Sequence, residues 1–294
     1  MLKNPRAEQR PVHHCKFRPL LFCFTFILLA LALACSRVAE QPATTASNDP
    51  DQLLRQMSEK LAQAKNLSFK VERKLDAALV EGRNVAENAV IEISVSRPGK
   101  FHAKSDSTDN ARQIFFDGQS LSIYDQTMKL YATAPVVGTI DEAVAKIDEI
   151  YGFTPPLAEF ILSDPYGALS KQIKTRTYKG KETIAGVECH HVSLSAVEAD
   201  SELWIGTADL LPRKLVATFK NREGNPQLQA VFSSWNLAPT LGDKMFTFVA
   251  ANDVEKIEMV TEVQMKEAAA KESDAPDSAN PQKSAKPVTR KKGT

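Results

Sequence analysis

The sequence lacks the short motifs that identify many enzyme active sites. It contains no Gly-x-Ser-x-Gly, no His-Glu-x-x-His, no glycine-rich phosphate loop and no Cys-x-x-Cys. These motifs serve, respectively, serine nucleophiles, zinc ligation, phosphate binding and thiol exchange. We therefore predict that the chain is not an enzyme, and we expect neither catalytic residues nor a cofactor.

Cysteine is scarce, since the 294 residues include four, at Cys15, Cys23, Cys35 and Cys189. The first two fall in a leader segment, and the third is a candidate for acylation. Cys189 is then left alone in the region expected to fold, so no internal disulfide is expected there. The stability of that region must come from buried apolar side chains and a hydrogen-bonded sheet.

The net charge is distributed unevenly along the chain. The total is +1, but residues 1–34 carry +4 and residues 264–294 carry +3, which leaves −6 for residues 35–263. An acidic folded region argues against nucleic acid as a partner. The sequence does not specify an oligomeric state.

A basic segment followed by an apolar run opens the chain. The run from Leu20 to Ala34 is 15 residues long and carries no charge. The positive residues before it are Lys3, Arg6, Arg10, Lys16 and Arg18. The run is shorter than the roughly 20 residues of a membrane-spanning helix and is typical of a signal peptide. We predict that residues 1–34 are removed on export and that residues 35–49 form a tether.

The end of the leader resembles a bacterial lipoprotein box, Leu31-Ala32-Leu33-Ala34-Cys35. The resemblance implies that Cys35 becomes the first mature residue and carries acyl chains. The usual leucine three residues before the cysteine is here Ala32, and the alternative is a plain Ala-x-Ala cleavage site that releases the protein. In enterobacterial lipoproteins, which this segment resembles, a residue other than Asp after the cysteine favours the outer membrane, and here that residue is Ser36. We predict a periplasmic protein anchored by its N-terminal acyl chains to the outer membrane of a Gram-negative bacterium.

The last residues differ in composition from the rest. Residues 264–294 are rich in alanine, proline, serine and charge and show no apolar periodicity. Such a segment buries too little apolar surface to offset its ordering entropy. We predict a disordered tail over 264–294 and one folded domain over 50–263.

Most of the folded region shows the alternation of apolar and polar residues that is typical of half-buried strands, as in Ala89–Ser96. Asp117-Gly118 between apolar strands predicts a hairpin. Helical periodicity is confined to four segments. These are 51–66, 139–150 with a Thr139/Glu142 capping box, 157–162, and a segment from Asp164-Pro165 to about Ile173.

From residue 174 onward the pattern again predicts strands, separated by turns that include Gly180 and Gly186. The last predicted strand is Phe246–Phe248. Helices do not alternate with single strands, which argues against a parallel doubly wound sheet. We therefore predict a mainly β fold of the α+β type. It is a curved antiparallel half-barrel of about ten strands, with three or four helices as a lid.

One segment, Glu188–His191, concentrates potential metal ligands. On a strand, Cys189 and His191 share one face, and His190 points to the other face with Val192 and Leu194. A metal site needs three or four convergent ligands, and His102 is the one other histidine outside the leader. We expect no metal site. A Cys189–His190 nucleophile pair is disfavoured, because adjacent strand residues point apart.

Aromatic residues on the predicted strands are candidates for binding a hydrophobic ligand. They are Phe101, Phe116, Trp204, Phe219, Phe232 and Trp235. The alternative role for each is ordinary core packing. A barrel of this size can hold a cavity, and an apolar cavity under helices is suited to a lipid-like ligand.

The order of several short segments resembles one known family. Gly186–His191 precedes Glu202-Leu203-Trp204-Ile205, then Leu211–Val216, Trp235–Pro239 and Phe246-Thr247-Phe248. These look like the predicted periplasmic proteins called domain of unknown function 2092, over about 55–258. The resemblance implies a fold similar to periplasmic lipoprotein carriers and outer-membrane lipoprotein receptors, an incomplete barrel that holds acyl chains. It implies no site residues.

Three functional hypotheses follow. The first is an exported lipoprotein that binds an acyl chain, a lipid or an acylated protein in an apolar half-barrel. The second is an envelope interaction or sensor module whose sheet covers a filled core. The third, and least favoured, is a hydrolase that uses Cys189, His190 or His191.

Overall fold

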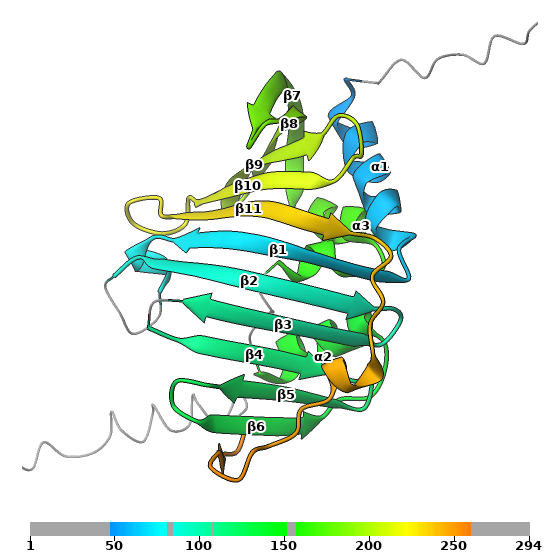
Figure 1. The fold of residues 1–294 in the computed structure, drawn as a ribbon. Coiled ribbons are helices and arrows are strands. Elements are labelled where there is room, and N and C mark those ends of the chain that lie inside the picture. Colours follow the sequence, from blue (N-terminus) through cyan, green and yellow to red (C-terminus); the bar gives the residue numbers. More distant parts are fainter. Residues whose placement is uncertain (1–47, 81–84, 108, 152–156, 260–294) are drawn as a thin grey trace, which may run out of the picture. The chain divides into compact units, whose positions relative to one another are not determined.

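The computed structural model describes residues 48–80, 85–107, 109–151 and 157–259, which form one large sheet and the helices beside it (Figure 1). The helices are α1 (Pro50–Ala62), α2 (Ile140–Tyr151) and α3 (Pro165–Ser170), and the 3-10 turns are η1 (Ala77–Leu79), η2 (Ala158–Phe160) and η3 (Asp243–Phe246). The strands are β1 (Asn66–Leu75), β2 (Glu87–Ser96), β3 (Lys100–Ser107), β4 (Ala111–Phe116), β5 (Ser120–Asp125), β6 (Leu130–Pro135), β7 (Ile173–Ile184), β8 (Val187–Ala196), β9 (Ala199–Gly206), β10 (Pro212–Phe219), β11 (Gln227–Asn236) and β12 (Glu255–Lys256).

The twelve strands lie in the order β12-β6-β5-β4-β3-β2-β1-β11-β10-β9-β8-β7. All neighbours pair antiparallel except β12, which joins β6 in parallel. The sheet does not close, because β7 and β12 are its two edges within the described residues. The predicted mainly β, open and curved antiparallel architecture with three helices is confirmed, and two strands are added to the predicted ten.

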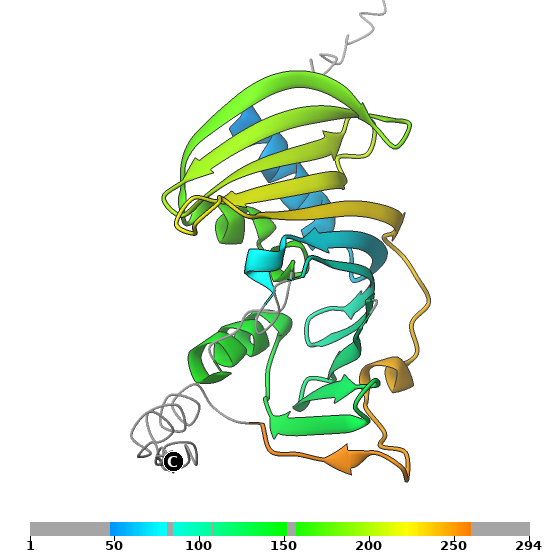
Figure 2. The same cartoon turned by 90° about the vertical axis from the view of Figure 1, so that its left-hand side faces the viewer.

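The three helices lie on the concave side of the sheet (Figure 2). Helix α1 begins where Asp49 caps it by accepting a hydrogen bond from Asp51 N (3.1 Å), with Pro50 in the first turn. Its buried face recurs at the helical period. The residues of that face are Leu53, Leu54, Met57 and Leu61, all at most 1% exposed.

Local sequence signals explain where the other helices begin. The predicted capping box forms, because Thr139 N donates to Glu142 Oε2 (2.8 Å) and Glu142 N donates to Thr139 Oγ1 (3.2 Å). Asp164 accepts from Gly167 N (2.9 Å) and so caps α3. The hairpin at Asp117-Gly118 also forms, with Gly118 at φ +89°, a conformation that glycine adopts without strain.

Five predicted boundaries are wrong. Helix α3 ends at Ser170 and not near Ile173, which begins β7. Helix α1 ends at Ala62 and not at residue 66, and the expected helix over 157–162 is the short turn η2. Gly180 does not end a strand but lies inside β7, where the register shifts by a bulge and φ is +116°. Phe246–Phe248 is not a strand, because η3 and an extended segment occupy this region.

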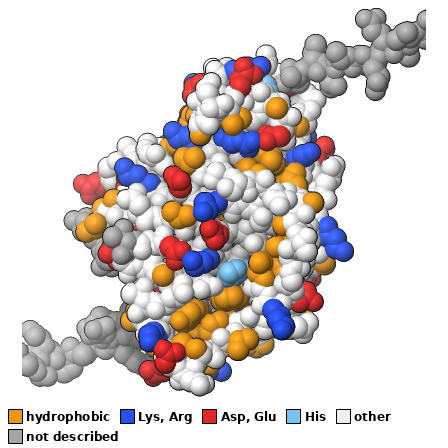
Figure 3. Space-filling model, in the orientation of Figure 1, with side chains coloured by type: hydrophobic (Ala, Val, Ile, Leu, Met, Phe, Trp, Pro, Cys, Tyr) orange, Lys and Arg blue, Asp and Glu red, His pale blue; other side chains and the backbone are white. Residues whose placement is uncertain are grey.

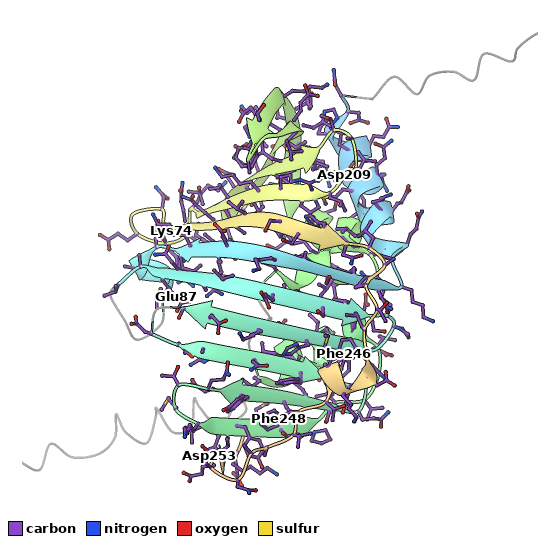
Figure 4. The ribbon with its side chains drawn as sticks, in the orientation of Figure 1. Lys74, Glu87, Asp209, Phe246, Phe248 and Asp253 are labelled. Atoms are coloured by element: carbon purple, nitrogen blue, oxygen red, sulfur yellow. The ribbon has the colours of Figure 1, made fainter. Side chains whose placement is uncertain are left out.

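The segment that follows η3 crosses the convex face of the sheet. Phe248 packs on Phe115, Tyr124 and Tyr131, with ring centroids 5.5, 5.3 and 5.0 Å away. Phe246 is 1% exposed, and both rings are labelled in Figure 4. The segment then reaches β12, which pairs with Leu130 and Tyr131 of β6.

Several predictions concern residues outside the described ranges. The signal peptide 1–34, Cys35 and the tail 264–294 all belong to this group. Within the described ranges, no helix combines the length and the apolar character needed to cross a bilayer.

Candidate functional site

The concave face of β1–β5 becomes more polar from one end of the strands to the other. The strand register places concave-facing side chains in rows that run across the sheet. One row is Val95, Phe101, Phe116 and Leu121. Two rows further along, the corresponding positions are Ile91, Ser105, Arg112 and Asp125, and the last row holds Arg73, Ala89 and Ser107.

A cavity of about 350 Å³ opens on this face. Its apolar floor is formed by Ile91, Ile93, Ala103, Ile114 and Ile123. Its polar rim is formed by Arg73, Glu87, Ser105, Ser107, Asn110 and Arg112. The volume lies at the lower end of the range found for small-molecule sites, which are mostly apolar with few polar groups.

The apolar end of the strands is closed by packed side chains. Phe101 and Phe116 are 1% and 0% exposed, and their ring centroids lie 5.7 Å apart. Ile140 and Ile147 of α2 are fully buried in the same core. These two predicted ligand-binding residues, Phe101 and Phe116, therefore lie in the core, and neither lines the cavity.

Among the residues that the structure describes, the rim carries two ion pairs. Arg73 and Glu87 form one pair, with side chains 10% and 18% exposed. Arg112 Nε donates to Asp125 Oδ2 (3.2 Å) in the second pair, and the Arg112 side chain is 58% exposed. Glu87 lies at the end of β2, beside the mouth of the cavity (Figure 4).

A second cavity, of about 370 Å³, lies between α3, η2 and the concave face of β8–β11. Phe219 lines it together with Leu194, Leu203 and Leu215. Glu159 also lines it, and burial raises the pKa of this carboxyl above its usual value. Such surroundings make the charged form of this carboxyl less favourable than it is in water.

An aromatic cluster on β1, β11 and η2 lies where the strands of the first cavity meet those of the second. Trp235 stacks on Phe69 with centroids 4.2 Å apart, and Phe232 packs against both rings. A bulge that adds one residue to β11 between Ser233 and Asn236 brings Trp235 back to the face of Phe232. Two of the predicted ligand-binding residues, Phe232 and Trp235, therefore pack together in an aromatic wall, and neither lines either cavity.

Trp204 lies on the convex face, opposite to Leu203 and Ile205. It stacks on His191 with ring centroids 4.3 Å apart. Its Nε1 donates to Glu182 (3.0 Å). The convex face carries scattered charges and gathers hydrophobic side chains over its lower strands (Figure 3). Trp204 is thus separated by the sheet from both concave cavities.

The Glu188–His191 segment forms part of β8. His190 is 2% exposed, its Nδ1 lies 3.2 Å from Tyr178 Oη, and burial lowers its pKa. The thiol of Cys189 is buried, which raises its pKa, and it donates to Val187 O (3.3 Å). His191 lies between the carboxylates of Glu182 and Glu202. In the part of the chain that the structure describes, no three such side chains converge as a metal site would require.

Sequence reasoning missed the charged rim. The signal was present in β1, where every second residue points inward. Between the inward residues Val71 and Leu75, the inward position is occupied by Arg73. An arginine at an inward strand position is unusual, because a buried charge needs a partner. The partner, Glu87, begins the inward series of β2.

The chain belongs to the family described as predicted periplasmic protein (DUF2092), whose model matches residues 50–260. The resemblance expected from the sequence is thereby confirmed. None of the curated proteins matches the chain.

Solved structures resemble the chain at low sequence identity. An uncharacterized conserved protein from Thermus thermophilus is 11% identical, with 70% of this chain and 98% of that chain covered and a TM-score of 0.42. LprF from Mycobacterium bovis is 12% identical (71% and 98% covered, TM-score 0.39). A LolA superfamily protein from Nitrosomonas europaea is 9% identical (66% and 97% covered, TM-score 0.32).

Proposed function

We propose that this chain is a non-enzymatic periplasmic protein that binds an acyl chain, as a free lipid or as part of an acylated protein, in the concave-face cavity. The observation that carries the proposal is the change from the apolar floor to the charged rim within one cavity. An amphiphile likewise changes from an apolar chain to a polar or charged head group along its length. The floor would hold the chain, and the rim would face the head group.

The closed end of the strands supports the same orientation. Because Phe101 and Phe116 fill the apolar end, an acyl chain would enter from the side of the rim and stop against the packed core. Burial of each methylene group contributes about 0.8 kcal/mol. Each further methylene group that is buried on the floor therefore strengthens binding, against the entropy cost of ordering the chain.

We further propose that Cys35 anchors the mature protein to the outer membrane. The experiment is fractionation of cells that express the full chain or its Cys35→Ser variant. Membrane association that persists in the variant would contradict acyl anchoring. This test is independent of the cavity.

The cavity is tested by native mass spectrometry and by binding of a fluorescent fatty acid to the purified mature chain. Ala103→Phe adds a ring on the floor, and Val90→Phe adds the same ring at an exposed position (41%) on the opposite face of the sheet. We expect binding to the parent protein and to Val90→Phe, and its loss in Ala103→Phe. Equal binding by both variants would place the ligand elsewhere.

An interaction module with a filled core remains the alternative. The two cavities on the concave face argue against a wholly filled core. The discriminating experiment is a pull-down with and without residues 264–294. A partner lost together with these residues would favour the interaction module.

A further inference from the structure

We propose that the cavity selects ligands with an anionic oxygen head group and that Arg73 is the residue that recognises it. This inference rests on the proposed function and adds the chemical class of the ligand. Free fatty acids and single-chain lipid phosphates share this chemistry. The ligand class follows from the donors at the rim.

The side chain of Arg73 is largely withdrawn from solvent, and its hydrogen-bonding capacity is only partly used. Its side chain is 10% exposed, and it pairs with Glu87 through one terminal nitrogen. Its Nε is buried and has no hydrogen-bond partner among the described residues. A guanidinium presents five N–H donors in a planar fork that matches a carboxylate or a phosphate. An unpaired buried donor is unfavourable, so an acceptor placed beside it is stabilised.

The position of Arg73 relative to the floor supports the same conclusion. Its cross-strand neighbour on β2 is Ala89, and the next inward residue along that strand is Ile91, on the floor of the cavity. A head group held at Arg73 therefore leaves its chain directed along the isoleucines. Arg112, more exposed and on the same rim, is a second cation within the cavity lining, and its charge is shared with Asp125.

A second rim residue, Asn110, also has an unpartnered polar atom, but this atom is an acceptor. Asn110 Oδ1 is buried and has no partner within the described ranges. The amide of Asn110 presents both a donor and an acceptor, and rotation of the amide exchanges them. Only Nδ2 of Asn110 can donate to an anionic oxygen, so Asn110 assists Arg73 when its amide turns this nitrogen toward the head group.

Glu87 is the internal competitor for the guanidinium of Arg73. A ligand anion must share or replace this carboxylate. Removal of the negative charge in Glu87→Gln should therefore raise the affinity for anionic ligands, whereas removal of the arginine should lower it. These opposite changes distinguish recognition from a general loss of structure.

The experiment measures binding of palmitate, hexadecyl phosphate and hexadecanol to the full mature chain at pH 8. The variants are Glu87→Gln and Arg73→Met/Glu87→Gln, the second of which does not leave the charge of Glu87 without the guanidinium of Arg73. Lys70→Met is the matched control, because it removes a cation from the opposite face of β1.

We expect the parent chain to prefer both anionic ligands over hexadecanol by about tenfold, the contribution of one charge-assisted hydrogen bond. The preference should increase in Glu87→Gln, persist in Lys70→Met and disappear in the double variant. Equal affinity of the parent for all three ligands, or a preference that survives in the double variant, overturns the assignment of Arg73. No binding of any of the three, hexadecanol included, overturns the proposed function itself.

Discussion

Phe160 meets Phe232 almost edge-on, with ring centroids 4.9 Å apart and an interplanar angle of 63°. Phe160 belongs to η2 and Phe232 to β11, and they are 0% and 2% exposed. The contact fastens a turn that lies beside the second cavity to the centre of the sheet. It completes the aromatic wall of Phe69, Phe232 and Trp235.

We predict that Phe160→Ala destabilises the protein by about 3–5 kcal/mol, the usual cost of removing a fully buried phenylalanine. Phe219→Ala is the control, because Phe219 is half-buried and lines a cavity that already exists. It should cost clearly less. Urea unfolding of both variants measures the difference, and equal losses would contradict the role given to Phe160.

The sequence was sufficient to predict the architecture because its signals are local. Alternation in β2, the Asp117-Gly118 turn and the capping box at Thr139 each depend on a few adjacent residues. Pairing that depends on distant residues was not predictable. The bulge at Gly180 and the parallel pairing of β12 with β6 arise from contacts across the sheet.

Glu159 gives a prediction about pH. Burial raises its pKa above the usual value of 4.5, so the folded state disfavours its charged form. Its contribution to stability is therefore favourable below the unfolded pKa and is lost as the pH rises through the folded pKa. We predict that Glu159→Gln melts at a higher temperature than the parent at pH 8.

At pH 4 the same two proteins should melt at similar temperatures, because the carboxyl of Glu159 is then largely protonated in both states. Thermal melts followed by circular dichroism at the two pH values provide the measurement. A difference of the same size at both pH values would show that the charge of Glu159 is not responsible.

For His190 we expect the opposite dependence of stability on pH. Burial, and then the charge of Lys181, lowers its pKa below the usual 6.5. The folded state therefore excludes a proton that the unfolded chain binds, so stability is complete above pH 6.5 and decreases as the pH falls below it. His190→Gln, which cannot be protonated, should lose less stability than the parent between pH 7 and pH 5. Chemical unfolding at both pH values measures this, and identical losses would refute the prediction.

The segment across the convex face should stabilise the folded state through the rings of Phe246 and Phe248. Phe246→Ala should cost about 3–5 kcal/mol because Phe246 is fully buried. Phe248→Ala should cost about 1–2 kcal/mol, through the loss of contacts with three rings. Asp253→Asn, which removes the exposed ion pair with Lys129, is the control and should leave the free energy of unfolding unchanged. If Asp253→Asn lost as much free energy of unfolding as Phe248→Ala, the stabilising role given to the aromatic rings would be contradicted.

Sequence patterns suggested an apolar cavity on the sheet but not the residues that line it. Aromatic side chains on strands suggested a hydrophobic site, yet Phe101, Phe116, Phe232 and Trp235 build the core around the cavities. The floor consists instead mainly of isoleucines, which single-sequence patterns do not distinguish from ordinary core residues. Whether an inward residue packs against a helix or faces a cavity depends on where the helices lie on the sheet.

Ligand binding in the concave cavity can be observed in an isoleucine-methyl NMR spectrum recorded with a fatty acid that carries a spin label near the end of its chain. We predict broadening of the methyl signals of the four floor isoleucines, Ile91, Ile93, Ile114 and Ile123. The signals of Ile205 on β9 and of Ile257, which is 44% exposed, should stay sharp. Broadening confined to Ile257, or no broadening at all, would contradict binding in the concave cavity.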